Sequence, residues 1–264
     1  MSLHHQKNTC LEKIKALESG ILKLAFLIIF LFNVANSYAQ NKTIIVDDFQ
    51  KIIISPHIQV TFKQGTKEEV FIEEATIPMD KINIEVHNKT LRIYLDDAKT
   101  KTKTVYKNGS KQKTPIYKGT IVKAIITYKN LNELSLRGEQ TFVCESLLDG
   151  KEFQLKIFGE SRVYLNEVQL KTLHATIYGE SLLEIKKGTI NKQKFTAYGE
   201  SKINALGVNN NDTKITAFGA GSYRFNVSDQ LKITAFGEAV VAFEGNPAID
   251  KGIVIGEATI QQLN

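Results

Sequence analysis

The chain has 264 residues, with 34 Lys or Arg, 28 Asp or Glu and a formal net charge of +6 at pH 7. Two cysteines exclude the disulfide-rich class of small exported domains, and 42% hydrophobic residues suffice for a core without such cross-links. Most of the basic excess lies in one short segment, which argues against a nucleic-acid-binding surface.

Residues 1–39 have the pattern of a secretory signal peptide. Lysines precede the apolar run at 24–32, and small residues follow at 37–39, so the mature chain would begin at Gln40. The apolar stretch falls short of the roughly 20 residues that span a bilayer, which makes a membrane anchor the weaker alternative. We therefore expect export to the periplasm, the outer-membrane surface or the medium, with no stable membrane span after cleavage.

Residues 40–135 predict a β-rich region that forms either the first coils of a longer structure or a cap on its end. Ile58, Val60 and Phe62 illustrate the alternation typical of half-buried strands. The segment 98–123 interrupts this pattern with eight lysines and no acidic residue. We interpret it as a solvated β-excursion or loop, and the alternative is a patch for acidic glycans or anionic lipid heads.

Residues 136–264 repeat a short motif. It reads IFGES at 157–161, IYGES at 177–181 and AYGES at 197–201, with weaker copies on both sides. Its glycines are 18 to 21 residues apart, too close for helical-hairpin repeats but suited to short strands and turns. These predicted turn glycines are Gly138, Gly159, Gly179, Gly199, Gly219, Gly237 and Gly256.

The residues around each glycine predict two strands that meet at a turn. Ala175 and Ile177 alternate with Thr176 and Tyr178, as in a half-buried strand, and glycine suits a bend with positive φ. One such unit cannot bury its apolar face, but stacked copies form a continuous core. The sequence therefore predicts an all-β fold: a right-handed parallel β-helix or β-solenoid with repeats of about 20 residues, after an irregular β-rich N-terminal part.

Stacking of equivalent strands at about 4.8 Å would align equivalent side chains in ladders. The predicted aromatic ladder comprises Phe158, Tyr178, Tyr198, Phe218 and Phe236. The predicted acidic ladder comprises Glu160, Glu180 and Glu200, with Glu139, Glu238 and Glu257 as outer members. We expect the aromatic rings to serve packing rather than sugar stacking.

The glutamates have two interpretations. In the structural one, each carboxylate accepts hydrogen bonds from turn N–H groups or from the hydroxyls of Ser161, Ser181 and Ser201. In the alternative, successive carboxylates hold a row of Ca²⁺ ions. The sequence lacks the Asp-containing nonapeptide of Ca²⁺-binding β-rolls, which favours the structural interpretation.

We predict no catalytic, cofactor-binding or metal-binding residue. His57, His87 and His174 have no metal-ligand spacing, and Cys144, set among apolar neighbours, has no evident base. A phosphate-binding loop and a nucleophile elbow are also missing from the sequence. A row of identical glutamates does not separate a general acid from a base, so a polysaccharide-cleaving enzyme remains only an alternative.

The motifs resemble those of the putative auto-transporter adhesin, head GIN domain family. The FGES and YGES repeats, the closing segment 236–247 and the entry segment 49–74 carry the resemblance, which covers roughly residues 45–260. It implies a strand-coil fold in an exported protein of Bacteroidetes-type bacteria, with an adhesin role and no established catalytic residues. Because no translocating barrel follows Asn264, we do not expect a self-sufficient autotransporter.

Together these patterns predict an exported, non-enzymatic adhesion or envelope-interaction module without a cofactor. Its expected partners are glycans or other envelope components, and nucleic acid is not expected. A purely structural envelope protein is a further alternative.

Overall fold

The computed structural model describes residues 41–98, 102–107 and 110–263. The predicted signal peptide and Cys10 lie outside this range. The described chain is nearly all β, with the short 3₁₀ turn η1 (Met79–Lys81) between strands. Within it, no helix is long and apolar enough to cross a membrane. The all-β solenoid predicted from the sequence is confirmed.

The strands divide into an N-terminal group and a repeat group. The N-terminal strands are β1 (Lys42–Ile45), β2 (Lys51–Ile54), β3 (Ile58–Gln64), β4 (Glu69–Ala75), β5 (Ile82–His87), β6 (Thr90–Leu95), β7 (Thr102–Lys107), β8 (Ser110–Pro115) and β9 (Val122–Tyr128). The repeat strands are β10 (Glu133–Gly138), β11 (Thr141–Gly159), β12 (Arg162–Tyr178), β13 (Leu182–Ile185), β14 (Gly188–Tyr198), β15 (Lys202–Phe218), β16 (Gly221–Phe236), β17 (Ala239–Glu244), β18 (Ala248–Ile255) and β19 (Ala258–Gln262).

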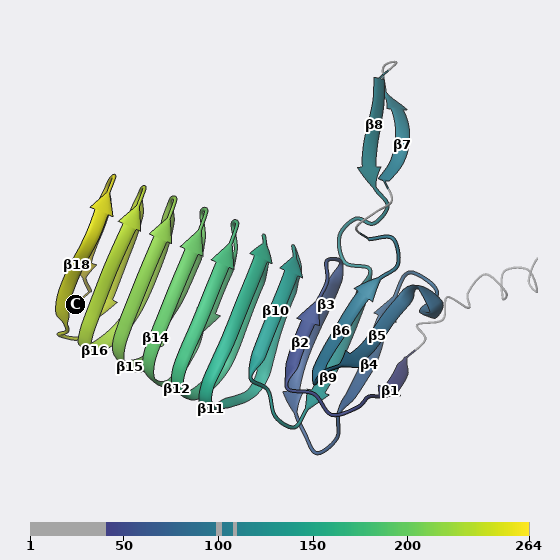
Figure 1. The fold of residues 1–264 in the computed structure, drawn as a ribbon, viewed down its shortest axis with the longest axis horizontal. Helices are drawn as coiled ribbons and strands as arrows, with labels where there is room; N and C mark the ends of the chain where they lie inside the picture. Colours follow the sequence, from purple (N-terminus) through teal and green to yellow (C-terminus); the bar gives the residue numbers. More distant parts are fainter. Residues whose placement is uncertain (1–40, 99–101, 108–109, 264) are drawn as a thin grey trace, which may run out of the picture. The chain divides into compact units, whose positions relative to one another are not determined.

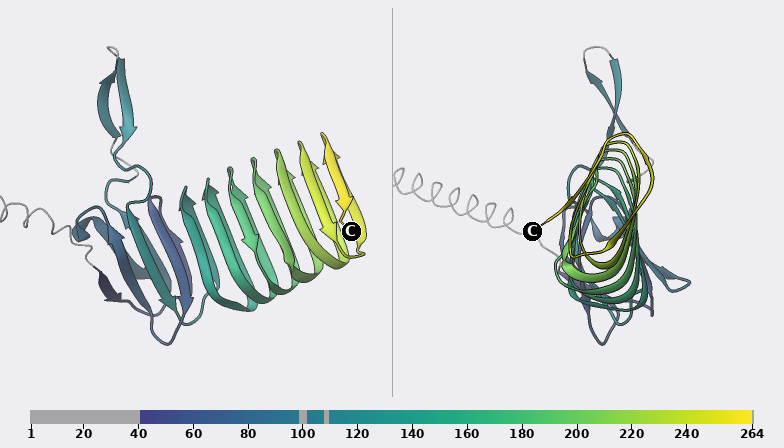
Figure 2. Two further views of the ribbon diagram at one scale, coloured as in Figure 1. Left: turned by 180° about the vertical axis from the view of Figure 1, so that it is seen from behind. Right: turned by 90° about the vertical axis from the view of Figure 1, so that its left-hand side faces the viewer.

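Each repeat makes one coil with two sheet faces that meet at a glycine corner (Figures 1 and 2). We call them the pre-glycine and post-glycine faces, after the residues that build them. Neighbouring coils pair in parallel, so Leu155, Ala175 and Phe195 lie side by side. All three are buried, and their outward neighbours are more exposed. This alternation places one continuous apolar core inside the coils.

The coils extend into the N-terminal part and end there in an antiparallel cap. β2 pairs in parallel with β10 and β3 with β11, so β2 and β3 flank the first corner, at Pro56–His57. Beyond them β4 runs antiparallel to β9, and β5 antiparallel to β6. The region thus contains both a coil and a cap, and the expected boundary between residues 135 and 136 falls inside β10.

The lysine-rich excursion is a β-hairpin. β7 and β8 pair only with each other among the described strands, and the hairpin lies between β6 and β9 in the chain (Figure 1). The excursion expected at 98–123 ends earlier than predicted, because β9 begins at Val122. Lys123 belongs to β9, where its Nζ lies 2.6 Å from a carboxylate oxygen of Glu74.

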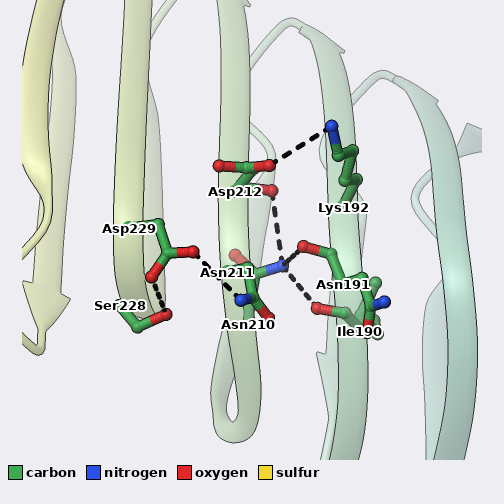
Figure 3. Close-up of polar contacts among 8 residues, drawn as sticks. All are labelled: Ile190, Asn191, Lys192, Asn210, Asn211, Asp212, Ser228 and Asp229. Atoms are coloured by element: carbon green, nitrogen blue, oxygen red, sulfur yellow. Dashed lines mark hydrogen bonds and ion pairs between the residues drawn. The ribbon is translucent and has the colours of Figure 1, made fainter.

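Buried amides hold the bend where the post-glycine face turns into the next pre-glycine face. Asn210 Nδ2 donates to the carbonyl oxygen of Ile190 in the preceding coil, 2.8 Å away, and Figure 3 shows this contact. Thr213 Oγ1 donates to Asn210 Oδ1, and Gln193 Nε2 donates to Thr213 Oγ1. Because these side chains are buried, the hydrogen bonds of the Asn210 amide and the Thr213 hydroxyl satisfy polar groups that would otherwise be costly there.

The glycine corners leave no room for a side chain. Gly179 has φ of +100°, and a Cβ added there would lie 2.3 Å from the carbonyl oxygen of Gly159. That oxygen is backbone of the preceding coil, so it cannot move without shifting the stack. Both the dihedral angle and the contact therefore require glycine.

We predict that Gly179→Ala lowers the free energy of unfolding by about 2–4 kcal/mol, through backbone strain and the carbonyl contact. Gly119→Ala is the matched control, because Gly119 has φ of +64° but nothing within 4 Å of an added Cβ. It should cost about 1 kcal/mol from the dihedral angle alone. Urea unfolding of both variants measures the difference, and equal losses would contradict a contact between corners.

Burial sets the chemistry of Cys144. Its side chain is buried, with Sγ 3.7 Å from Tyr128 Oη, and desolvation raises the pKa of its thiol to about 12. The folded state therefore keeps the thiol proton at pH values where the unfolded chain, with a pKa near 9.0, loses it. Any stability due to Cys144 is present below pH 9 and is lost as the pH rises from there toward 12.

We predict that native protein at pH 8 reacts with an aromatic disulfide reagent at least a hundredfold more slowly than protein in denaturant. The reason is that Cys144 is both inaccessible and protonated. Absorbance of the released thiolate measures the rate. Rapid stoichiometric reaction of the native protein would show that the core around β11 opens readily.

Candidate functional site

The motif serines point into the coil and connect one corner to the next. Ser161 Oγ donates to the carbonyl oxygen of Gly138 and Ser181 Oγ to that of Gly159, each at 2.9 Å. The expectation that these hydroxyls bond to the motif carboxylates is wrong for both residues. Strand alternation places serine inside and the preceding glutamate outside, so the glycine carbonyl is the acceptor within reach.

The corner at Gly219 departs most from the motif, with Ala220–Gly221 in place of Glu–Ser. A Cβ at Gly221 would lie 2.0 Å from Tyr223 Oη, so the tyrosine hydroxyl fills the space that the missing side chain leaves. Burial raises the pKa of Tyr223, and the nearby Ser201 hydroxyl lowers it in part. The hydroxyls of Tyr223 and Ser201 are both buried, and neither has a hydrogen bond of ordinary geometry. Ala220 separates Glu200 from Glu238 and Glu257, so the acidic row has four members on one side of it.

Glu139, Glu160, Glu180 and Glu200 line one groove along the corner, together with Arg162, Ser181, Leu182 and Lys202. The four glutamates are exposed, and the high dielectric constant of water weakens the repulsion between like charges of neighbouring coils. Arg162 and Lys202 add compensating positive charge to the same groove. None of the four carboxylates has a hydrogen bond or ion pair with another described residue, so their oxygens remain available to a ligand.

A second hollow continues this groove toward the N-terminal cap. Glu139 and Glu160 line both, and the second also contains Pro56, His57, Tyr117, Lys118, Gly119, Gly138, Gln140 and Gly159. We call the whole channel the corner groove, with a row part from Glu139 to Glu200 and an end pocket around His57 and Tyr117. The sequence indicated the row through its repeated glutamates.

The end pocket was not predicted, because its residues break the repeat. Gln140 replaces the motif serine, and its buried Oε1 accepts hydrogen bonds from the backbone N–H groups of His57 and Glu139 at 2.9 and 3.2 Å. Its Nε2 donates to the carbonyl oxygen of Gly119, 3.2 Å away. The only sequence signal was the change from GES to GEQ at residues 138–140.

The aromatic ladder lies beside the corner on the pre-glycine face. Neighbouring ring centroids are 4.7 to 5.1 Å apart, with interplanar angles of 3 to 5°. The Arg137 guanidinium lies 5.2 Å from the centroid of Phe158 and covers the outer face of that ring. Because each inner ring is covered on both faces by its neighbours, the aromatic ladder exposes mainly ring edges to solvent. Such a ladder serves packing and cannot stack a sugar between its rings.

The Ca²⁺ alternative, in which successive carboxylates hold cations, stays a prediction. Among the residues that the structure describes, no three His, Cys, Asp or Glu side chains are grouped so that they could hold one metal ion. His87 and His174 lie apart, each near one glutamate, Glu85 and Glu152 respectively. The glutamates of the row stand one per coil, so each contributes a separate acceptor.

A family model described as "Putative auto-transporter adhesin, head GIN domain" matches residues 48–247. The chain belongs to this family. The resemblance inferred from the GES repeats is thus confirmed, over nearly the same residues. None of the curated proteins compared with the chain matches it.

Solved structures of low sequence identity share the fold. A putative adhesin from Bacteroides fragilis has a TM-score of 0.70 at 19% identity and covers 86% of this chain and 98% of its own. One from Parabacteroides merdae has a TM-score of 0.64 at 19% identity, with 87% and 98% covered. A putative lipid binding protein from Parabacteroides distasonis has a TM-score of 0.62 at 17% identity, with 87% and 98% covered.

We predict that Glu180→Gln leaves the free energy of unfolding unchanged or raises it by tenths of a kcal/mol, because it removes one of a row of like charges. A chelator should not change the melting temperature of the unmodified protein. Calorimetry with and without chelator and Ca²⁺ measures both effects. A fall in melting temperature on chelation that Glu180→Gln abolishes would instead establish the Ca²⁺ interpretation.

Proposed function

We propose that this protein is an exported, non-enzymatic adhesion module that binds extended glycan chains along the corner groove. The observation that carries the proposal is the row of four exposed carboxylates with no partner among the described residues, repeated once per coil. The export part rests on the signal-peptide pattern of residues 1–39 and on membership of an adhesin family.

The spacing of the row suits a polymer. Equivalent backbone positions of neighbouring strands recur at about 4.8 Å, which is close to the advance of one sugar unit along an extended β-linked chain, so one glutamate per coil can meet one sugar unit. Carboxylates are strong acceptors for hydroxyl groups, and Arg162 and Lys202 supply donors in the same groove. A glycan lying along the corner would repeat the same hydrogen bonds in every coil. Many weak, equivalent contacts of this kind give useful total affinity.

The same geometry favours binding over cleavage. Glycosidases separate the roles of two carboxyl groups by giving them different surroundings, usually with the acid in an apolar pocket. Here the four glutamates are all exposed and occupy equivalent places in successive coils. The names of the family and of the similar structures also refer to adhesion or lipid binding rather than to catalysis.

The test uses immobilised mixed-linkage β-glucan, xylan and mannan. We expect the mature chain to bind at least one of them, and Glu160→Gln/Glu180→Gln to weaken that binding about tenfold or more, because two charged acceptors are lost. Glu152→Gln, an exposed glutamate of the pre-glycine face that lines a different surface, is the control and should bind normally. Biolayer interferometry gives the affinities.

Two results would contradict the proposal. Failure to bind any of the three polysaccharides would remove the glycan function, and release of reducing sugars would remove the non-enzymatic one. Equal weakening by the control would mean that overall negative charge, rather than the groove, decides binding.

A further inference from the structure

We infer that the corner groove recognises the end of a glycan chain, because the segment Tyr117–Gly119 stands across its N-terminal end. This inference rests on the proposed function and specifies which part of the ligand occupies the end pocket. A groove open at both ends would accept any internal stretch of a polymer, whereas a groove closed at one end requires a terminus there.

The topology explains why the groove ends at this point. The register of β3 with β11, continued through the corner, places His57 beside Glu139 at the head of the glutamate row. The next corner would join β6 directly to β9, since these strands flank β2 and β3. The chain instead leaves at Asp96, forms the β7–β8 hairpin and returns through Tyr117 to Ile121. The returning segment therefore occupies the place of the next open corner.

Hydrogen bonds fix the returning segment against the first corner. The carbonyl oxygen of Gly119 accepts from Gln140 Nε2 at 3.2 Å and lies 2.8 Å from His57 Nδ1. Tyr117 Oη donates to the carbonyl oxygen of Asp96, 3.1 Å away, and its ring meets His57 edge-on at 5.9 Å. His57 itself has φ of +72°, a strained conformation for this residue that these contacts hold in place. The wall of the pocket is therefore preformed.

The end pocket offers more kinds of contact than any coil of the row. A carbonyl oxygen only accepts, so His57 donates through Nδ1, and neutral His57 keeps Nε2 as an acceptor. Glu139 and Glu160 add carboxylate acceptors, Lys118 adds a donor, and the partly exposed ring of Tyr117 gives an apolar surface. A terminal sugar carries a free hydroxyl where an internal unit carries a glycosidic bond, so this mixed set suits a chain end.

The opposite end of the row lacks such a wall. Beyond Glu200 the corner residue is Ala220, which is exposed and presents no polar side chain. A bound chain can therefore continue past Lys202 into solvent. The groove is thus directional, with the terminal unit at His57 and the rest of the chain along the glutamates.

The test compares each of the three polysaccharides before and after limited digestion with its own endo-acting glycosidase, at equal sugar mass. Digestion multiplies chain ends without changing the amount of polymer. We expect the protein bound per gram to rise in proportion to the number of ends. Binding that follows mass and ignores ends would overturn this inference while leaving the proposed function intact. No binding to intact or digested material would overturn both.

Variants distinguish the contribution of the segment Tyr117–Gly119, which forms the wall of the end pocket, from that of the glutamate row. Lys118→Ala changes an exposed side chain of the end pocket and should weaken binding of digested fragments about fivefold, and Tyr117→Ala should weaken it more. Glu180→Gln should weaken binding but keep its proportionality to chain ends. Melting temperatures confirm that each variant is folded. Unchanged fragment binding by both wall variants would overturn the inference.

Discussion

The positive-φ glycine at each corner from Gly138 onward is the constraint on which the rest of the structure depends. Its backbone lies against the glycine carbonyl of the preceding coil, so neighbouring coils approach in only one register. Once that register is set, the strand residues on both sides of the corner lie beside their equivalents in the next coil, and the register shifts only farther along, as between Cys144 and Leu147. Gly199 and Gly219 repeat the contact that Gly179 makes, which is why the motif tolerates change around the glycine more readily than at it.

The fixed register turns a repeated sequence into columns of identical chemistry. Inside the corner, the hydroxyls of Ser161 and Ser181 donate hydrogen bonds to glycine carbonyl oxygens of the preceding coil. Outside it, aromatic rings stack on each other and glutamates stand free in water. Structural demands are therefore met by the inner column and the rings, and the carboxylates of Glu160 and Glu180 have no structural contact to maintain among the described residues. Because the inward serines and the aromatic rings meet the structural demands, we assign the function to the column of exposed glutamates.

The coils were predictable from sequence because their signals are local and repeated. Period-two alternation identified the buried faces, and evenly spaced glycines identified the corners. The hydrogen-bond acceptors of Ser161 and Ser181 differ from the glutamates considered in the sequence analysis, since the sequence shows neighbours along the chain but not the carbonyl of the preceding coil. The first corner was missed because Pro56–His57 lacks the glycine. The antiparallel pairing of β4 with β9 depends on contacts between segments about 50 residues apart, for which a single sequence holds no pattern.

The central claim is that ligand contacts follow the corner column from the end pocket through the glutamate row. Backbone amide chemical shifts of the mature chain, titrated with fragments of the bound polysaccharide, test it most directly. The account predicts perturbations at residues 117–119, 138–140, 159–161, 179–181 and 199–201, strongest at the end pocket, with the pre-glycine face unaffected. Perturbations centred on the pre-glycine face, at residues 172–176 of β12 and 192–196 of β14, with none at the corner residues, would contradict it.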